Sequence, residues 1–426
     1  MGRTKQTSFR KQQWKMLLIT MLCYLFFYTG RHNFGWAANG MASALHLSYS
    51  TIGWISFSML IGYSIGQLIN GNLADRLSAR LMVTAGAYLS ILINVAISFS
   101  NEGWVIMVLW TLNGYFQSMA WAPGAKLINN WWGEKERGKA FGFYTMAAGL
   151  SSVVTYLISI LLIQQDYEWR MLFRLPVLLL LVSATLFMII ARDKPPLKLA
   201  QRPATDEKAA VKENWSYQYS YVLKNKRFLL VSLAFGFESM ARYGLVFWVP
   251  VHFLGQDWKQ SSNSLWVTLL LPMGMAAGAL CFGLVSDTLF KKDRMKAILV
   301  GMLASACVSI LVYLTPGNWL LLSGLLMLLA GFCVYGPQAC FWPLSPDLLG
   351  DKYTATGVGF MNMCGYLFAA LGEPLLGHVI DWTKTTNSIF IVITIICLLS
   401  TVITFAAWKS GSKIEPFFSE AKRDKN

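Results

Sequence analysis

The sequence predicts an all-α membrane protein with twelve transmembrane helices arranged as two pseudo-symmetric six-helix bundles. Three observations support this fold class: the chain is 55% hydrophobic and only 13% charged, long apolar runs recur along it, and a loop motif of the first half returns in the second. A soluble domain cannot bury so many apolar side chains, whereas a bilayer accepts them on the outside of a helix bundle. The 17 Trp and 17 Tyr residues suit side chains that line the lipid–water interfaces.

Apolar runs of about 20 residues, the length that crosses a bilayer, define the expected spans. They are 14–41, 50–72, 80–99, 104–129, 138–163, 171–191, 227–255, 262–285, 294–315, 318–346, 353–380 and 387–408. The predicted organisation is an N-terminal tail (1–13), an N-terminal six-helix bundle (14–191), a linker (192–226), a C-terminal six-helix bundle (227–408) and a C-terminal tail (409–426).

The positive charges predict how the chain is oriented in the membrane. The formal net charge of +15 gathers in both tails and in alternate loops, and the linker together with Arg227 carries nine basic and four acidic residues. Loops rich in Lys and Arg stay in the cytoplasm, so we expect both termini there. No basic patch with interleaved aromatic residues lies on a soluble module, so the charge does not indicate a nucleic acid partner.

A repeated loop marks the two halves as related. GNLADRLSAR follows the second span and contains Asp75 and Arg76, while GLVSDTLFKKDR follows the eighth and contains Asp287. An arginine precedes each loop at a matching distance: Arg31 lies 44 residues before Asp75, and Arg242 lies 45 residues before Asp287. Two such halves predict a substrate site between them near the membrane midplane, as in secondary transporters.

Arg31 and Arg242 are informative because both fall inside apolar runs. A guanidinium group stays charged at physiological pH, and placing one near the bilayer centre costs at least about 2.5–3.5 kcal/mol on insertion scales. Such a residue normally faces a cavity, a bundle interior or a partner, so we expect both arginines in the site between the halves. The alternative is an arginine neutralised by a carboxylate for packing alone.

The motifs resemble those of one transporter family. GNLADRLSAR resembles the loop after the second span of the major facilitator superfamily, and NGYFQSMAWAPGAKLINNWWGEKERGKAFG (113–142) is similar to the organophosphate:phosphate antiporters, the family of the bacterial glycerol-3-phosphate and hexose-6-phosphate transporters. YTGRHNF, ARYG, VYGP and GYL in spans one, seven, ten and eleven resemble the same family. The resemblance covers nearly the whole chain. It implies the major facilitator fold and a bacterial inner membrane location.

The resemblance also implies that Arg31 and Arg242 bind the substrate's phosphate group from the two halves. The chemistry agrees, because a planar guanidinium group donates paired, charge-assisted hydrogen bonds to phosphate oxygens. Tyr24 and Tyr28 precede Arg31 on about the same helix face and resemble the family's aromatic lining, with ordinary bundle packing as the alternative. The full set of expected substrate-binding residues is Arg31, Arg242, Tyr24, Tyr28, Gln67, Gln117, Glu238 and Glu373.

Four positions depart from the family pattern. Gln67 and Ala148 align where family members carry a lysine and a histidine, so the expected site lacks a charge and a titratable group. Glu238 lies four residues before Arg242 on the same helix face, and we interpret it as a shield for the arginine in the empty site. Glu373, in ALGEPLLG, stays open as a proton site, a ligand for a hydroxyl group or an internal counter-ion.

A conformational latch is expected at the cytoplasmic loops. A carboxylate at a helix end, such as Asp75, can pair with basic residues or cap a neighbouring helix. Contacts of this kind can stabilise one conformation of a rocking bundle and break in the other. We assign this role to Asp75, Arg76, Arg137 and Asp287.

The sequence does not indicate an enzyme. The seven cysteines lie in apolar runs without metal-ligand spacing, and the four histidines show no such spacing either. No nucleophile–base constellation, Walker loop or dinucleotide fingerprint occurs. We expect no metal and no cofactor. The expected state is a monomer whose partners are a phosphorylated metabolite, inorganic phosphate and the lipid bilayer.

The predicted function is secondary active transport of small phosphorylated organic anions, of the sugar phosphate or glycerol phosphate type, in exchange for inorganic phosphate by alternating access. Two alternatives stay open. Arginine also binds carboxylates, so a proton-coupled carboxylate or sugar-acid symporter would use the same residues. A membrane sensor on the same scaffold would bind sugar phosphate without transporting it.

Overall fold

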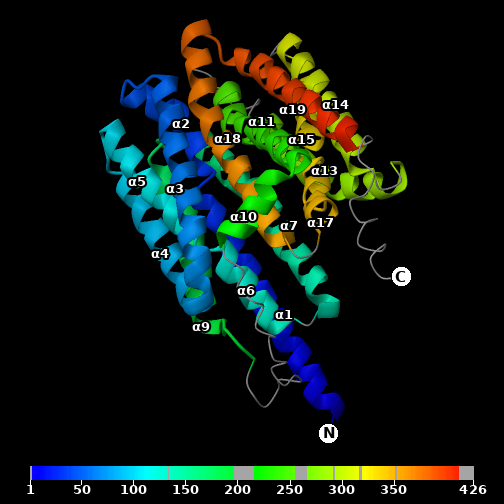
Figure 1. The fold of residues 1–426 in the computed structure, drawn as a ribbon. Coiled ribbons are helices and arrows are strands. Elements are labelled where there is room, and N and C mark those ends of the chain that lie inside the picture. Colours follow the sequence, from blue (N-terminus) through cyan, green and yellow to red (C-terminus); the bar gives the residue numbers. More distant parts are fainter. Residues whose placement is uncertain are drawn as a thin grey trace.

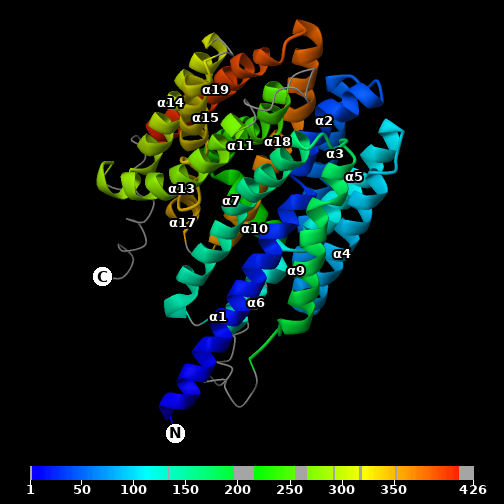
Figure 2. The ribbon, with the colours of Figure 1, turned by 180° about the vertical axis from the view of Figure 1, so that it is seen from behind.

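The computed structural model describes residues 2–132, 134–195, 215–254, 266–290, 293–315, 319–350 and 353–411. Throughout these ranges the regular structure is helical, with no strand. Figures 1 and 2 show long helices that run side by side, with the N-terminal helix extending from one end of the molecule.

The first half of the chain contains ten helical elements. They are α1 (Gly2–Phe27), η1 (Tyr28–Gly30), α2 (Asn33–Ala44), α3 (Tyr49–Arg76), α4 (Ala79–Ile97), α5 (Gly103–Gln117), α6 (Trp121–Trp131), α7 (Glu134–Gln164), α8 (Met171–Arg174) and α9 (Pro176–Ile190).

In the second half, a short helix lies in the described part of the linker and is followed by the remaining elements. They are α10 (Trp215–Lys224), α11 (Lys226–Leu254), α13 (Leu270–Thr288), α14 (Arg294–Leu314), α15 (Leu320–Tyr335), α16 (Gln338–Phe341), α17 (Leu344–Leu349), α18 (Thr354–Thr383), η3 (Thr386–Ser388) and α19 (Ile389–Gly411).

Local sequence signals explain where several helices begin. The Ser48 hydroxyl accepts the Thr51 amide at 3.1 Å at the start of α3, and the Ser78 hydroxyl accepts the Leu81 amide at 3.3 Å at the start of α4. A serine in this position satisfies one of the amides that the first turn of a helix leaves unpaired. Pro176 opens α9, where the missing N–H group costs nothing.

Within the described residues, nine segments are long and apolar enough to cross a membrane. They match nine of the expected runs, and the runs 14–41, 104–129 and 138–163 are not among them. The first of these is interrupted at η1 and the second between α5 and α6, while the third is the uninterrupted helix α7, whose apolar part is short (Gly149–Gln164). The count of twelve spans therefore stays a prediction.

Helix packing brings the two halves of the chain together along three contacts. In the first half α4 packs on α5 and α9, and α1 packs on α7 and α9. In the second half α11 packs on α18 and α19, α13 on α15, and α14 on α19. The contacts between the halves join α3 to α18, α2 to α11, and α7 to α13. The division into six-helix bundles at 14–191 and 227–408 remains a prediction.

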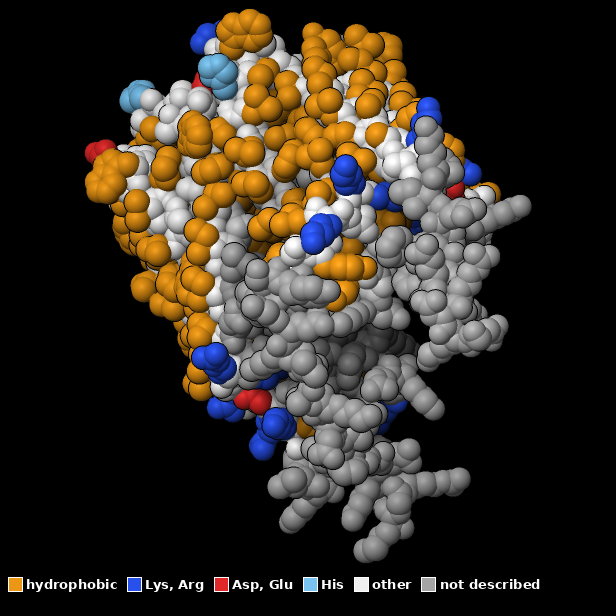
Figure 3. All heavy atoms as spheres, viewed as in Figure 1, with side chains coloured by type: hydrophobic (Ala, Val, Ile, Leu, Met, Phe, Trp, Pro, Cys, Tyr) orange, Lys and Arg blue, Asp and Glu red, His pale blue; other side chains and the backbone are white. Residues whose placement is uncertain are grey.

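The outer surface carries the side chains that a bilayer would cover. Leu321, Leu280 and Ile189 are 91%, 74% and 73% exposed. Figure 3 shows hydrophobic side chains over most of one face, with a group of Lys and Arg side chains at its lower end. An apolar surface of this extent is unfavourable in water and favourable in lipid.

The contact between α3 and α18 is close at the end where α3 begins. A Cβ atom on Gly53 would lie 2.5 Å from a carbonyl oxygen of α18, and one on Gly377 would lie 2.3 Å from a carbonyl oxygen of α3. Glycine permits this approach of two membrane helices because it has no side chain. Toward the other end, Gly71 and Gly359 have no described atom within 4 Å of the corresponding position, so neither glycine makes such a contact.

Candidate functional site

Arg31 lies at a break between two helices. α1 ends at Phe27, the single 3-10 turn η1 follows, and α2 begins at Asn33. The backbone of Arg31 has φ −129° and ψ −51°, which lies outside the helical region. Such a break leaves carbonyl groups without helical partners, and the interior of a membrane protein must satisfy them in another way.

A cluster of buried amide side chains satisfies the carbonyl groups at this break. The Gly30 carbonyl oxygen accepts hydrogen bonds from Asn113 Nδ2 at 2.8 Å and from Asn94 Nδ2 at 3.2 Å. The Phe27 carbonyl oxygen accepts one from Gln117 Nε2 at 2.9 Å. All three amides are at most 4% exposed. They fix the backbone on both sides of the turn, and so fix the point from which the arginine side chain extends.

Four tyrosine rings surround the guanidinium group of Arg31. Its Cζ atom lies 4.6 Å from the ring centre of Tyr63, 5.5 Å from Tyr243, 5.6 Å from Tyr28 and 6.0 Å from Tyr366. Its Nη2 atom also donates a hydrogen bond to Tyr243 Oη at 3.2 Å. Aromatic faces attract a cation more strongly when water is excluded, so the rings offset part of the cost of burying the charge.

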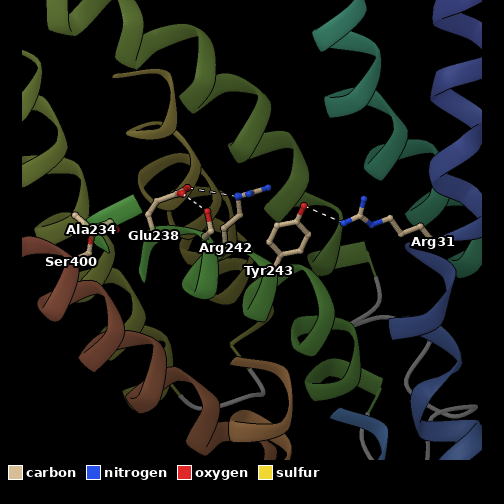
Figure 4. Close-up of polar contacts among 7 residues, drawn as sticks. Arg31, Ala234, Glu238, Arg242, Tyr243 and Ser400 are labelled. Carbon is tan, nitrogen blue, oxygen red and sulfur yellow. Dashed lines mark hydrogen bonds and ion pairs between the residues drawn. The ribbon is translucent and has the colours of Figure 1, made fainter. Parts of the chain in front are cut away.

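Arg242 lies on the other side of the Tyr243 ring. Its Cζ atom is 4.3 Å from that ring centre and 5.3 Å from the ring centre of Tyr335. Figure 4 shows Tyr243 between the two arginines, with its hydroxyl group directed at Arg31. The structure thus brings together two arginines that are 211 residues apart in the sequence.

Glu238 pairs with Arg242 in this conformation. Its Oε1 atom lies 3.6 Å from Arg242 Nε, and its Oε2 atom accepts a hydrogen bond from Ser239 Oγ at 3.1 Å. At 3.6 Å the contact between Oε1 and Nε is an ion pair without a hydrogen bond, and within the described part of the chain neither atom has another hydrogen-bond partner. Glu238 and Arg242, which lie one helical turn apart, therefore form an ion pair in this conformation, and the role of Glu238 as a shield stays a prediction.

A small cavity of about 40 Å³ lies beside Arg31. Its walls include Arg31, His32, Tyr243, Phe247 and Glu373. A water molecule needs roughly 10–15 Å³ of such volume, so the cavity has room for a few waters and not for a phosphate ester. A larger ligand would require the surrounding helices to separate.

The sequence matches the Major Facilitator Superfamily over residues 20–373. The chain belongs to this superfamily. It is 26% identical over 398 residues to a phosphoglycerate transporter protein of Salmonella typhimurium, covering 88% of this chain and 85% of that protein. It is 25% identical over 426 residues to a glycerol-3-phosphate transporter of Bacillus subtilis, covering 96% and 95%.

A solved structure of the same fold is a bacterial homologue of the human lysosomal transporter Spinster in an inward-facing, unoccupied conformation. The TM-score is 0.83 at 15% sequence identity, and the match covers 95% of this chain and 99% of that one. The major facilitator fold and the resemblance to organophosphate transporters are therefore confirmed. This facilitator is an integral, multi-pass membrane transporter and not an enzyme.

His32 is a cavity residue that the sequence did not indicate. Its Nδ1 atom lies 3.0 Å from Ser152 Oγ on α7, and its ring lies 5.0 Å from the ring of Tyr28. In a continuous helix, consecutive side chains point about 100° apart, so His32 could point away from Arg31 around the helix. The break at η1 removes that constraint, and both side chains reach the same cavity.

Of the tyrosines around the two arginines, Tyr28 was expected, whereas Tyr63, Tyr243, Tyr335 and Tyr366 were missed, although the sequence contained a signal for three of them. Tyr243 is the tyrosine of ARYG, Tyr335 that of VYGP and Tyr366 that of GYL, which are the motifs that carried the family resemblance. Their convergence depends on the packing of α11, α15 and α18, which no local pattern specifies.

The structure places several expected site residues outside the cavity walls. Tyr24 Oη lies 3.1 Å from Tyr28 Oη, and the Tyr24 ring packs on Trp121 and Tyr144. Gln117 belongs to the amide cluster, and Gln67 is half-buried on α3 without lining the cavity.

The expected latch residues lie mostly beyond what the structure describes. The side chains of Asp75, Arg137 and Asp287, and also that of Ala148, fall outside the described residues. Arg76 is exposed at the end of α3. Their role as a latch stays a prediction.

Proposed function

We propose that this facilitator transports small phosphorylated organic anions, of the glycerol phosphate or sugar phosphate type, in exchange for inorganic phosphate. The observation that carries the proposal is the position of Arg31 and Arg242 on the two sides of Tyr243, one from each half of the chain. Two guanidinium groups can share one phosphate through charge-assisted hydrogen bonds, which are the strong ones. Both curated relatives described above carry names of transporters for phosphorylated metabolites, in support of this substrate class.

Binding of phosphate replaces weaker contacts of both arginines. In the described conformation Arg31 donates to a neutral phenol at 3.2 Å, and Arg242 has an ion pair with Glu238 that lacks a hydrogen bond. A phosphate dianion offers both groups a better acceptor and offsets the repulsion between two like charges. The halves can then close around the bound anion, so the protein changes its conformation across the membrane easily only with an anion bound. A transporter that changes conformation only when it is loaded exchanges one anion for another.

The protein resides in a bacterial inner membrane as a monomer with both termini in the cytoplasm. The charge of the tails and linker supports this orientation. The glycine contacts between α3 and α18 at Gly53 and Gly377 then lie at the outer end.

The direct test is counterflow in liposomes that contain the purified protein. Vesicles loaded with unlabelled phosphate should accumulate labelled phosphate and labelled glycerol 3-phosphate, and empty vesicles should not. Uptake that a pH gradient drives without internal phosphate would instead establish the proton-coupled symporter. Saturable binding of these anions without flux would establish the sensor.

A further inference from the structure

We infer that a groove along α1 binds one anionic phospholipid, with the head-group phosphate on basic side chains and the acyl chains on the apolar side chains that follow. The ligand class is a phospholipid with a net negative charge, such as phosphatidylglycerol. The inference needs only that the chain lies in a membrane, and it does not depend on the transported substrate. The groove shares no lining residue with the cavity beside Arg31.

The groove lies where α1 runs past the end of α9. It has a volume of about 680 Å³, and Figure 2 shows the first turns of α1 extending beyond α9. All but one of its lining residues belong to α1, and the remaining one is the last residue of α9. They are Arg10, Lys11, Trp14, Lys15, Leu18, Ile19, Leu22 and Ile190. Residues three and four positions apart share one face of a helix, so the groove follows the axis of α1.

The chemistry of the groove changes along the helix. The basic residues Arg10, Lys11 and Lys15 come first and are all exposed. The apolar residues Leu18 and Leu22 follow, and they are 57% and 39% exposed. At a rise of about 1.5 Å per residue, Leu22 lies roughly 16 Å farther along the helix axis than Lys11. A phospholipid has the same order of groups, because its charged phosphate lies at the membrane surface and its acyl chains lie deeper.

Contacts with the rest of the bundle fix the basic part of the groove. The ring centres of Trp14 and Trp132 lie 5.3 Å apart, and Arg10 Cζ lies 5.9 Å from the Trp132 ring centre. Gln13 Nε2 donates a hydrogen bond to the Trp131 carbonyl oxygen at 2.7 Å, which joins α1 to the end of α6. Tryptophan is enriched at the lipid–water interface, where phospholipid head groups lie. The basic side chains therefore extend from a fixed stretch of helix at head-group depth.

The charge of the groove decides which lipid fits. None of its lining residues is acidic, and across the described ranges no carboxylate lies within 4.0 Å of the amino group of Lys11 or Lys15. Each Lys or Arg beside an anionic membrane surface strengthens the association by about fivefold. A zwitterionic lipid has no net charge to offer these residues, and a soluble anion would leave Leu18 and Leu22 uncovered. An anionic phospholipid is complementary to both parts of the groove.

The experiment measures lipid binding by native mass spectrometry. The purified full chain in detergent is stripped of lipid and titrated with dioleoylphosphatidylglycerol or dioleoylphosphatidylcholine, and the spectra give the Kd of the first lipid bound. We expect phosphatidylglycerol to bind at least about tenfold more tightly than phosphatidylcholine. Glycerophosphoglycerol, the same head group without acyl chains, should not displace the bound lipid even in large excess.

The variants locate the binding site on α1. Lys11→Gln combined with Lys15→Gln should raise the Kd for phosphatidylglycerol by at least about tenfold and leave the Kd for phosphatidylcholine unchanged. Lys11→Arg combined with Lys15→Arg keeps both charges and should keep the wild-type Kd. Lys224→Gln combined with Lys226→Gln removes the same charge from two exposed residues of α10 and α11, so it is the matched control and should bind as wild type. Thermal unfolding without added lipid checks that each variant is folded.

Several results would overturn the inference. Equal Kd values for the two lipids in the wild type would do so, as would an unchanged Kd for phosphatidylglycerol in the glutamine variant of α1 or an equal loss in the matched control. Displacement by glycerophosphoglycerol would assign the basic residues to a soluble anion instead. A dimer that the wild type forms and the glutamine variant of α1 loses would assign the groove to a second copy of this chain.

Discussion

At the scale of single residues, the site depends on how the protein accommodates two buried positive charges close together. Arg31 is surrounded by aromatic rings and donates to Tyr243, and Arg242 has Glu238 as its ion-pair partner. The surroundings of the two arginines differ: Arg31 has neutral aromatic neighbours, whereas Arg242 has the carboxylate of Glu238 as its partner. Under the proposed function, Glu238 is therefore the group that would compete with phosphate for Arg242.

Glu238→Gln should strengthen phosphate binding and weaken the empty protein. Removing the carboxylate eliminates a competitor for Arg242 but leaves a buried charge without its partner, which is destabilising. We expect a lower Tm without phosphate and a larger rise in Tm on adding phosphate than in the wild type. Thermal unfolding in detergent across a phosphate series measures both quantities.

Ser239→Ala is the control for that experiment. It removes the 3.1 Å hydrogen bond to Glu238 and keeps the charge. It should leave the phosphate-dependent rise in Tm near the wild-type value. If Glu238→Gln lowered that rise instead, Glu238 would be a substrate contact rather than a shield for Arg242.

At the scale of helices, the break at η1 is what places Arg31 in the cavity, and the amide cluster is what stabilises the break. The sequence predicted a continuous span over 14–41, because its apolar run has no proline to mark an interruption. The signal that was present lies far away, in Asn94, Asn113 and Gln117, whose side chains satisfy the carbonyl groups that the break exposes. A pattern confined to one segment cannot indicate partners supplied by two other helices.

Asn113→Leu should reduce phosphate exchange as well as stability. The Gly30 carbonyl oxygen would lose its 2.8 Å donor and keep the 3.2 Å bond from Asn94, at a cost of about 0.5–1.5 kcal/mol, and the turn before Arg31 would lose part of its support. We expect a lower Tm together with a several-fold loss of phosphate affinity, measured by exchange per folded molecule.

Asn387→Leu is a matched control for this substitution. Its side chain donates to the Tyr313 carbonyl oxygen at 2.9 Å, which is the same kind of bond at a place remote from the arginines. It should lower Tm without changing phosphate affinity. Equal losses of affinity in the two variants would show that the amide cluster serves stability alone.

At the scale of the whole molecule, the halves meet closely at the end where α3 begins, which we call the closed end. The closed end has polar as well as glycine contacts: Asp381 on α18 accepts hydrogen bonds from the Tyr49 and Ser50 amides, at 3.0 and 2.7 Å, at the start of α3. A carboxylate at a helix N-terminus is favourable because it meets unpaired amides and the positive end of the helix dipole. These bonds must break when the molecule opens to this side.

Asp381→Asn should shift the population toward the conformation that is open at this end. The amide keeps an acceptor but loses the charge, so the closed end is weakened by roughly 0.3–1 kcal/mol. We expect faster labelling, by a small thiol reagent, of a cysteine introduced at Ser56, a buried residue of the cavity wall on α3. Unchanged or slower labelling would show that Asp381 does not contribute to closure.

Asp75→Asn tests the latch expected at the opposite end. Because its proposed role is to stabilise one conformation rather than to bind substrate, phosphate affinity in detergent should stay within a few-fold of wild type while the exchange rate falls. Turnover at the wild-type rate with a large loss of affinity would place Asp75 in the binding site instead.

The sequence predicted the fold class and the pairing of the arginines better than the details of the site. Apolar runs predict the spans, and the repeated loop predicts the matching positions of Arg31 and Arg242. Both features can therefore be predicted from a single sequence. The tyrosines around the guanidinium groups, the position of His32 and the structural role of Gln117 depend on how distant helices meet. Those contacts arise only from the packing of the whole bundle.

The measurement that tests the central claim most directly is phosphate exchange by Arg31→Lys and Arg242→Lys in liposomes. Lysine keeps the charge but loses the planar fork, and each lost charge-assisted hydrogen bond costs roughly 1.5–3 kcal/mol. Each variant should express and fold as the wild type does and should lose exchange by at least about tenfold, whereas Arg170→Lys, which lies on the Trp169 ring in the turn before α8, should retain it. Near-wild-type exchange by either Arg31→Lys or Arg242→Lys would contradict the two-arginine site.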